Sequence, residues 1–251
     1  MKKIKSIMIM ALICVVSLSM ASCGKKEDPL VKLNKALKAN SDITKIDAKI
    51  TGEISMNSAG QKVDFLIDFD LKGSDLSFKE ATSKAMIALK GSMKIKEPYE
   101  MEMPLEVYIK EGTIYTKMLG QTSKETFSDD FKNILMLGAQ EPEDSGDVIT
   151  KENTKSVKYE GKYIAVDLEG DDFLAGMEAA RPGMTDAMKV KACKIKFEFD
   201  DSDRLKSVQY LFDAVIAGDA QGDAFKMKLD IKFNKVDDKL KVEFPSDLAD
   251  Y

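Results

Sequence analysis

The sequence predicts an α+β fold that is mostly antiparallel β, with one strongly curved sheet and helices covering its concave side. Three observations support this prediction. Apolar and polar residues alternate with period two over many segments, short turns join these segments, and other stretches show the spacing of amphipathic helices. Because twist accumulates across many long strands, such a sheet curls, and helices with an apolar stripe fit its concave side.

The chain begins with a segment that we interpret as an export signal. Lys2, Lys3 and Lys5 precede an apolar run that ends at Met20. This is the layout of a secretory signal peptide. The run is also shorter than the roughly 20 residues that a membrane-spanning helix needs.

The sequence MASC at residues 20–23 resembles the lipobox of bacterial lipoproteins, with Met20 where leucine is most often found. The resemblance implies a signal peptide over 1–22, acylation of Cys23 by groups such as palmitate, and a short polar tether over 23–28. Two or three acyl chains hold a protein firmly on a bilayer. Ordinary signal cleavage that leaves a free thiol is the alternative.

The charge of the mature chain argues against nucleic acid as a partner. Residues 1–22 contain three of the 38 basic residues and none of the 43 acidic ones, so the mature charge is −8 (35 basic against 43 acidic). This composition also indicates no basic stripe for a membrane surface.

The chain contains no histidine, which excludes Ser-His-Asp and Cys-His catalysis and the common zinc sites. Beyond the signal and Cys23, only Cys193 is left, so the mature chain forms no intramolecular disulfide. We expect Cys193 to be a small buried thiol rather than a nucleophile. We therefore predict a protein that is not an enzyme, with no catalytic residue, metal or cofactor. A hydrolase that uses only carboxylates is the remaining enzymatic alternative.

A helix is predicted over residues 29–39, with Asp28 as its N-cap and Pro29 in its first turn. Strands follow wherever apolar residues alternate, with a tight turn at Glu111-Gly112. These first strands are predicted over 46–56, 63–71, 87–95, 99–109 and 113–118.

The second half repeats the mixture of elements without a sequence repeat. A helix is predicted over 128–139, followed by an acidic loop, and a kinked helical pair over 171–188. A hairpin over 156–168 turns at Glu160-Gly161. Further strands are predicted over 195–199, 208–212 and 225–233, and a last short one in the tail at 239–244.

Three segments, residues 107–118, 197–214 and 231–247, are similar to lipoproteins of the LolA- and LppX-like superfamily, in particular to Gram-positive members of unknown ligand. The resemblance covers most of residues 29–246 and depends on patterning and turn phrases. It implies that residues 29–251 form a single half-open β-barrel domain, with helices over its mouth and lipids or acyl chains bound between the two. It implies no catalytic residue.

Large apolar residues on the predicted concave face are the candidate ligand contacts, because aromatic rings and flexible thioethers suit a pocket for acyl chains. The same residues would equally fill a close-packed core. The candidates are Phe65, Phe69, Met101, Met103, Leu105, Phe197, Phe199, Phe225, Met227 and Phe233.

The acidic run at residues 200–203 lacks the glycine and the glutamate of an EF-hand loop. We interpret it as a turn between strands rather than a calcium site.

Taken together, the sequence predicts a monomeric, membrane-anchored lipoprotein that binds or carries a lipid or another hydrophobic ligand in an apolar cleft. Its expected location is the outer face of the bacterial cytoplasmic membrane, with a Gram-positive host favoured and an outer membrane as the other possibility. The alternative function is a non-enzymatic envelope interaction or scaffold module with a filled core.

Overall fold

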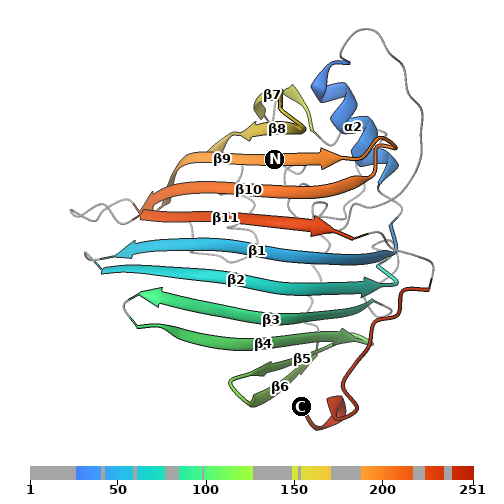
Figure 1. Ribbon diagram of the computed structural model, residues 1–251, viewed down its shortest axis with the longest axis vertical. Helices are drawn as coiled ribbons and strands as arrows, with labels where there is room; N and C mark the ends of the chain where they lie inside the picture. Colours follow the sequence, from blue (N-terminus) through green and yellow to red (C-terminus); the bar gives the residue numbers. More distant parts are fainter. Residues whose placement is uncertain are drawn as a thin grey trace.

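In the computed structural model, the strands of the described residues form one antiparallel sheet of eleven members (Figure 1). The structure describes residues 27–40, 43–58, 61–76, 85–97, 99–126, 149–151, 154–170, 188–216, 224–234 and 239–251. The strands are β1 (Lys45–Ser58), β2 (Gln61–Ser74), β3 (Met86–Glu97), β4 (Met101–Lys110), β5 (Thr113–Met118), β6 (Gln121–Thr126), β7 (Thr154–Glu160), β8 (Tyr163–Leu168), β9 (Met188–Phe199), β10 (Leu205–Ile216) and β11 (Ala224–Phe233).

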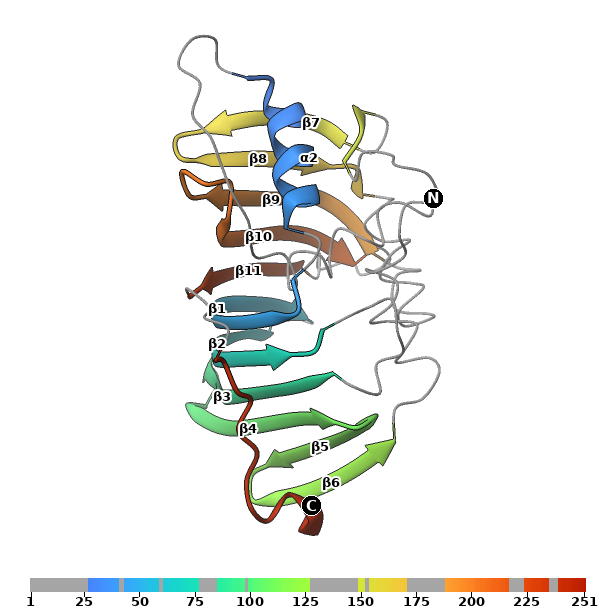
Figure 2. The ribbon, with the colours of Figure 1, turned by 90° about the vertical axis from the view of Figure 1, so that its right-hand side faces the viewer.

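Two meanders make up the sheet, and the pairing of β1 with β11 joins them. The strand order is β6-β5-β4-β3-β2-β1-β11-β10-β9-β8-β7, so every other pair of adjacent strands is also consecutive in sequence. Within the described residues, β6 and β7 are the two edges and do not pair with each other. The sheet is therefore curved and open (Figures 1 and 2), which confirms the predicted fold class and its half-open form.

The sheet has one apolar and one polar face, because its long strands keep the alternation of the sequence in register. Pairing of Ile50 with Phe69 on one side and with Ile231 on the other continues the apolar face across the join between the meanders. The neighbouring pairs of Lys49 with Asp70 and with Lys232 belong to the polar face. This arrangement follows from the two-residue repeat of a strand.

Helix α2 (Pro29–Ala39) packs on the apolar face beside β7–β9, as Figure 2 shows. The carboxylate of Asp28 accepts hydrogen bonds from the backbone N–H groups of Leu30 and Val31, which confirms the predicted N-cap. Leu33 and Leu37 are buried in the main core. The predicted helix over 29–39 is thus confirmed in its bounds and its apolar stripe.

Two buried asparagines fix α2 to the rest of the molecule. Asn34 donates to the carbonyl oxygen of Ile149 at 2.6 Å and accepts from the N–H of the same residue at 2.9 Å. At the end of the helix, the amide of Asn40 donates to the carbonyl oxygen of Asp203 at 2.8 Å and accepts from the N–H of Leu205 at 3.3 Å. Because these bonds reach two distant segments, α2 and the sheet form one packed body.

The last predicted strand is wrong: the segment 239–251 pairs with no strand in the described part of the chain. Its residues instead lie on the polar face at β3–β5, where Phe244 and Leu248 pack with Tyr108 in a second, small core. The ring of Tyr108 lies 6.1 Å from those of both Phe244 and Tyr251, centroid to centroid. The alternation in the tail therefore reflects side-chain packing on an already paired sheet.

The structure adds one strand that the sequence did not predict. Strand β6 follows the turn Leu119-Gly120, in which both residues have positive φ angles of 51° and 81°. The predicted turn at Glu111-Gly112 also has positive φ angles at both positions, 52° and 73°. Such angles match the twist of a two-residue hairpin.

Several predicted segments lie outside the described residues. These are the signal peptide and Cys23, the helix over 128–139 with the acidic loop after it, and the helical pair over 171–188 except Met188, the first residue of β9. Among the helices that the structure describes, none has the length and apolar character needed to span a membrane.

Candidate apolar binding face

The structure places all ten candidate ligand contacts on the apolar face of the sheet. The direct cross-strand partners of Phe65 include Ile54 on β1 and Ile95 on β3, and Ile95 in turn pairs with Met101. On the other meander, Phe197 pairs with Val208, and its ring lies 6.3 Å from that of Phe199 in a stacked arrangement. The predicted sharing of one face is therefore correct.

Residues of the apolar face are buried to different degrees on the two meanders. One cross-strand row, a line of residues that are direct partners on successive strands, shows this difference. Starting from Ile54, the row runs in one direction through Phe212 and Cys193, which are 4% and 6% exposed. In the other direction it runs through half-buried Phe65 and Ile95 to Met101, which is 45% exposed. Cover over the apolar face thus decreases from β9 toward β4.

The adjacent row shows the same difference. From Gly52 it passes Tyr210, Ile195 and Val166, all of them buried. On the other side it passes Met93 and Met103, which are only half-buried. We call the less covered part, made of Phe65, Ile67, Met93, Ile95, Met101 and Met103, the β2–β4 apolar patch.

The ten candidates therefore fall into different environments. Phe197 is 1% exposed and Phe69 is 8% exposed, so both belong to the packed core. Half-buried residues that pack against this core are Phe199, Phe225, Met227 and Phe233. Phe65, Met103 and Leu105 are half-buried on the other meander, and Met101 is exposed.

Sequence reasoning did not select several residues of the same rows, among them Ile67, Met93 and Ile95. The alternation that identified their neighbours also includes them, so the signal was present. It also did not select a group of exposed apolar residues at the hairpin end of the sheet. This group consists of Met56, Tyr99, Met118 and Leu119, which lie near the candidate Met101.

Two glycines keep the apolar face closely packed at its centre. A Cβ atom on Gly91 would lie 2.0 Å from the carbonyl oxygen of Asp68 and 2.7 Å from the Cα of Phe69, its direct cross-strand partner. A Cβ on Gly52 would lie 2.4 Å from the side chain of Leu229. Backbone and side-chain atoms of the neighbouring strands therefore occupy the space over both glycines.

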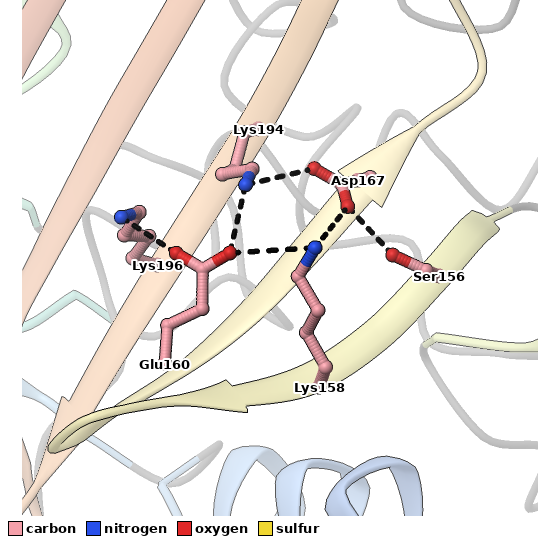
Figure 3. A network of polar contacts seen from close by, with 6 residues as sticks. All are labelled: Ser156, Lys158, Glu160, Asp167, Lys194 and Lys196. Atoms are coloured by element: carbon pink, nitrogen blue, oxygen red, sulfur yellow. Dashed lines mark hydrogen bonds and ion pairs between the residues drawn. The ribbon is translucent and has the colours of Figure 1, made fainter.

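The described part of the polar face carries networks of ion pairs, and one of them joins β7, β8 and β9 (Figure 3). Glu160 binds the ammonium groups of Lys194 at 2.9 Å and Lys196 at 2.7 Å. Hydrogen bonds from these two lysines lower the pKa of Glu160 to about 2. Asp167 accepts from Ser156 at 2.6 Å and pairs with Lys194 at 3.3 Å.

These carboxylates are therefore held ionised by lysines, whereas a general acid needs a raised pKa. Glu198 follows the same rule. Its burial alone would raise its pKa, but hydrogen bonds from Lys162, Ser207 and Lys206 bring the pKa below the usual value. The network stabilises the polar face and offers no pair of acids with opposite roles.

The acidic run at 200–203 forms a turn, as the sequence predicted. The carboxylate of Asp200 accepts from the backbone N–H groups of Ser202 and Arg204 and from the Arg204 guanidinium. Burial alone would raise the pKa of Asp200, but the bonds from Arg204 and Ser202 keep it below its usual value. In the described part of the chain, no group of acidic, cysteine or histidine side chains is placed to hold a metal ion.

Cys193 is 6% exposed on the apolar face of β9, and burial raises the pKa of its thiol to about 12. The prediction of a small buried thiol is confirmed. A neutral, buried thiol is not a nucleophile.

Comparisons with known proteins leave the family of this chain open. No family model and no curated protein matches the sequence. The crystal structure of LprF from Mycobacterium bovis is similar, with a TM-score of 0.40 and 10% identity over 86% of this chain and 96% of that chain. A bifunctional dehydratase-cyclase domain in ambruticin biosynthesis has a TM-score of 0.14 and 12% identity over 82% of this chain and 80% of that chain. What this chain binds therefore has to be inferred from its own geometry.

Proposed function

We propose that the protein is a membrane-anchored lipoprotein that binds a lipid or another hydrophobic ligand on its apolar face. The unequal cover of this face is the observation that supports the proposal. The same cross-strand rows that are buried over β9 and β10 are half-buried or exposed over β3 and β4. A folded chain gains by covering such residues, so this surface suits a bound apolar partner.

The chemistry of the β2–β4 apolar patch favours acyl chains. Its exposed and half-buried members are aliphatic residues, one phenylalanine and three methionines, without a polar group among them. Each methylene that moves from water to such a surface contributes about 0.8 kcal/mol. Methionine thioethers adapt to chains of different length because they rotate about three bonds.

The position of α2 fits an anchor at Cys23. Only residues 24–27 separate Cys23 from the N-cap Asp28. The hydroxyl of Tyr159 on β7 donates to the carbonyl oxygen of Glu27 at 3.1 Å, which ties the end of this tether to the sheet. In the proposed arrangement, a monomeric domain stands close to the outer face of the cytoplasmic membrane, and a Gram-positive host is favoured. We assign it no catalytic residue, metal or cofactor.

Native mass spectrometry of residues 24–251, produced in bacterial cytoplasm and followed by organic extraction, tests the ligand. We expect a discrete phospholipid adduct that solvent releases. Met101→Asp with Met103→Asp should abolish the adduct, because both change the patch without entering the buried core. Thr122→Asp is the matched control, since Thr122 is exposed and pairs with Lys117 on the polar face.

A clean apo mass for the parent, unchanged after incubation with mixed membrane phospholipids, would contradict lipid binding. That outcome would favour the second function, an envelope interaction module whose partner is a protein. Equal adduct loss in the Thr122→Asp control would show that a charge on the polar face removes the adduct as well as a charge on the apolar face does. A solvent-released adduct that only the double methionine variant loses supports lipid binding on the patch, whereas a clean apo mass supports the interaction module.

A further inference from the structure

One face of α2 is rich in lysine. Its sequence, PLVKLNKALKA, contains three lysines and no aspartate or glutamate. Val31, Lys35 and Lys38 are exposed and lie on one stripe, opposite buried Leu33 and Leu37. Lys32 flanks this stripe, with its side chain 37% exposed and 3.9 Å from Asp203. We call Lys32, Lys35 and Lys38 the α2 lysines.

We propose that the α2 lysines contact the anionic headgroups of the bilayer that holds the anchor, and that they set the orientation of the whole domain. This inference depends on the anchor of the proposed function. Net charge predicted no such surface, because the mature chain carries −8. The fold nevertheless collects three lysines on the first element after the tether.

Distance brings these lysines within reach of the bilayer. Five residues after Cys23 span at most about 17 Å. The helix itself is about 16 Å long, since each of its residues rises 1.5 Å. Charges act over about 8 Å at physiological salt. A helix that lies along the surface would therefore bring its lysines into the range of the headgroups.

The acidic remainder of the chain makes this orientation selective. An anionic bilayer repels a domain of charge −8, so any surface without local lysines is turned away from it. Because Asn34 and Asn40 tie α2 to distant segments, the helix cannot turn independently of the sheet. The direction of the lysines thus determines the direction of the apolar face.

Lysine footprinting on vesicles tests this orientation. Residues 23–251 are coupled through the Cys23 thiol to a maleimide lipid, while Cys193 stays unreacted because it is buried. The vesicles contain phosphatidylcholine with or without phosphatidylglycerol. Acetylation by an N-hydroxysuccinimide ester is then followed at each lysine by mass spectrometry. Lys228 and Lys232 on β11, both exposed, serve as internal controls.

We expect Lys35 and Lys38 to react about fivefold more slowly on the anionic vesicles than on the neutral ones, and the control lysines to react equally on both. High salt should remove the difference. In Lys35→Glu with Lys38→Glu, Lys32 should lose its protection, whereas Lys228→Glu with Lys232→Glu should leave it intact.

Equal rates at Lys35 and Lys38 on both kinds of vesicle would overturn the proposal, as would an equal slowing at Lys228 and Lys232. The coupling imposes the anchor chemically and involves no ligand. A negative result would therefore refute the orientation alone. The mass of the protein extracted from membranes tests separately whether Cys23 is lipidated in the cell.

Discussion

Replacing Asn34 by alanine should destabilise the protein more than any change on the exposed side of α2. The Asn34 amide makes two hydrogen bonds to the backbone of Ile149, at 2.6 and 2.9 Å, and Ile149 is completely buried. The substitution leaves one buried N–H and one buried carbonyl group without these bonds. Each unsatisfied buried group costs about 1–3 kcal/mol, so we expect a loss of about 2–6 kcal/mol.

Urea unfolding followed by far-ultraviolet circular dichroism measures this loss as a shift of the midpoint at constant slope. Lys35→Ala is the matched control, because Lys35 is the exposed neighbour of Asn34 on the same helix, and it should change stability by less than about 0.5 kcal/mol. Asn34→Asp keeps an acceptor for the Ile149 N–H but removes the donor, so it should also destabilise. An Asn34→Ala protein within about 0.5 kcal/mol of the parent would refute the role given to this amide.

Three further outcomes follow from the packing and charges of the sheet. Gly91→Val should lower stability by about 2 kcal/mol or more in the same urea assay, because a Cβ would lie 2.7 Å from the Cα of Phe69; an unchanged midpoint would show that the strands separate freely. The pKa of Glu160 is lowered to about 2 from an ordinary value of about 4.3, so its stabilising effect is complete above about pH 4.3 and is lost as pH falls toward 2. Glu160→Gln should therefore weaken the acid dependence of the urea midpoint, and an unaltered pH profile would contradict the assignment. The thiol of Cys193, with a pKa of about 12, should react with Ellman's reagent only after unfolding, whereas rapid labelling of native residues 24–251 would show that the site is open.

Local signals in the sequence were sufficient for most of the fold. Asp28 and Pro29 are residues that begin helices, and the structure starts α2 at Pro29 with Asp28 as its cap. The long strands were predictable because one face of each is apolar. Glu111-Gly112 was predictable as a turn, since glycine accepts the positive φ that this hairpin requires.

Strand β6 was not predictable from alternation, because all six of its residues are exposed and none is apolar. It forms because the hairpin at Leu119-Gly120 brings it beside β5. The opposite error occurred in the tail, where a strand was predicted because Val242 and Phe244 alternate with polar residues. In the structure these two side chains pack onto Tyr108, and the tail is not a strand. Alternation of apolar and polar residues therefore indicates which side chains are buried. It does not indicate whether the backbone pairs with another strand.

The candidate site shows the same limit. Composition and alternation identified Phe197 and Met101 as equivalent members of one apolar face, and the structure does place both there. Their exposures of 1% and 45% differ because Phe197 lies in the main core, which α2 covers with Leu33 and Leu37, whereas Met101 is not part of that core. Such cover depends on tertiary packing between distant segments, which residue spacing along a strand does not report.

Photo-crosslinking with a diazirine-bearing palmitate tests the central claim most directly. The probe is bound to residues 24–251, activated, and its attachment sites are read by fragmentation mass spectrometry. We predict adducts on the β2–β4 apolar patch, above all at Met101 and Met103, that unlabelled phospholipid competes away. No adducts, or adducts spread equally over the polar face at residues such as Lys228, would contradict lipid binding on the apolar face.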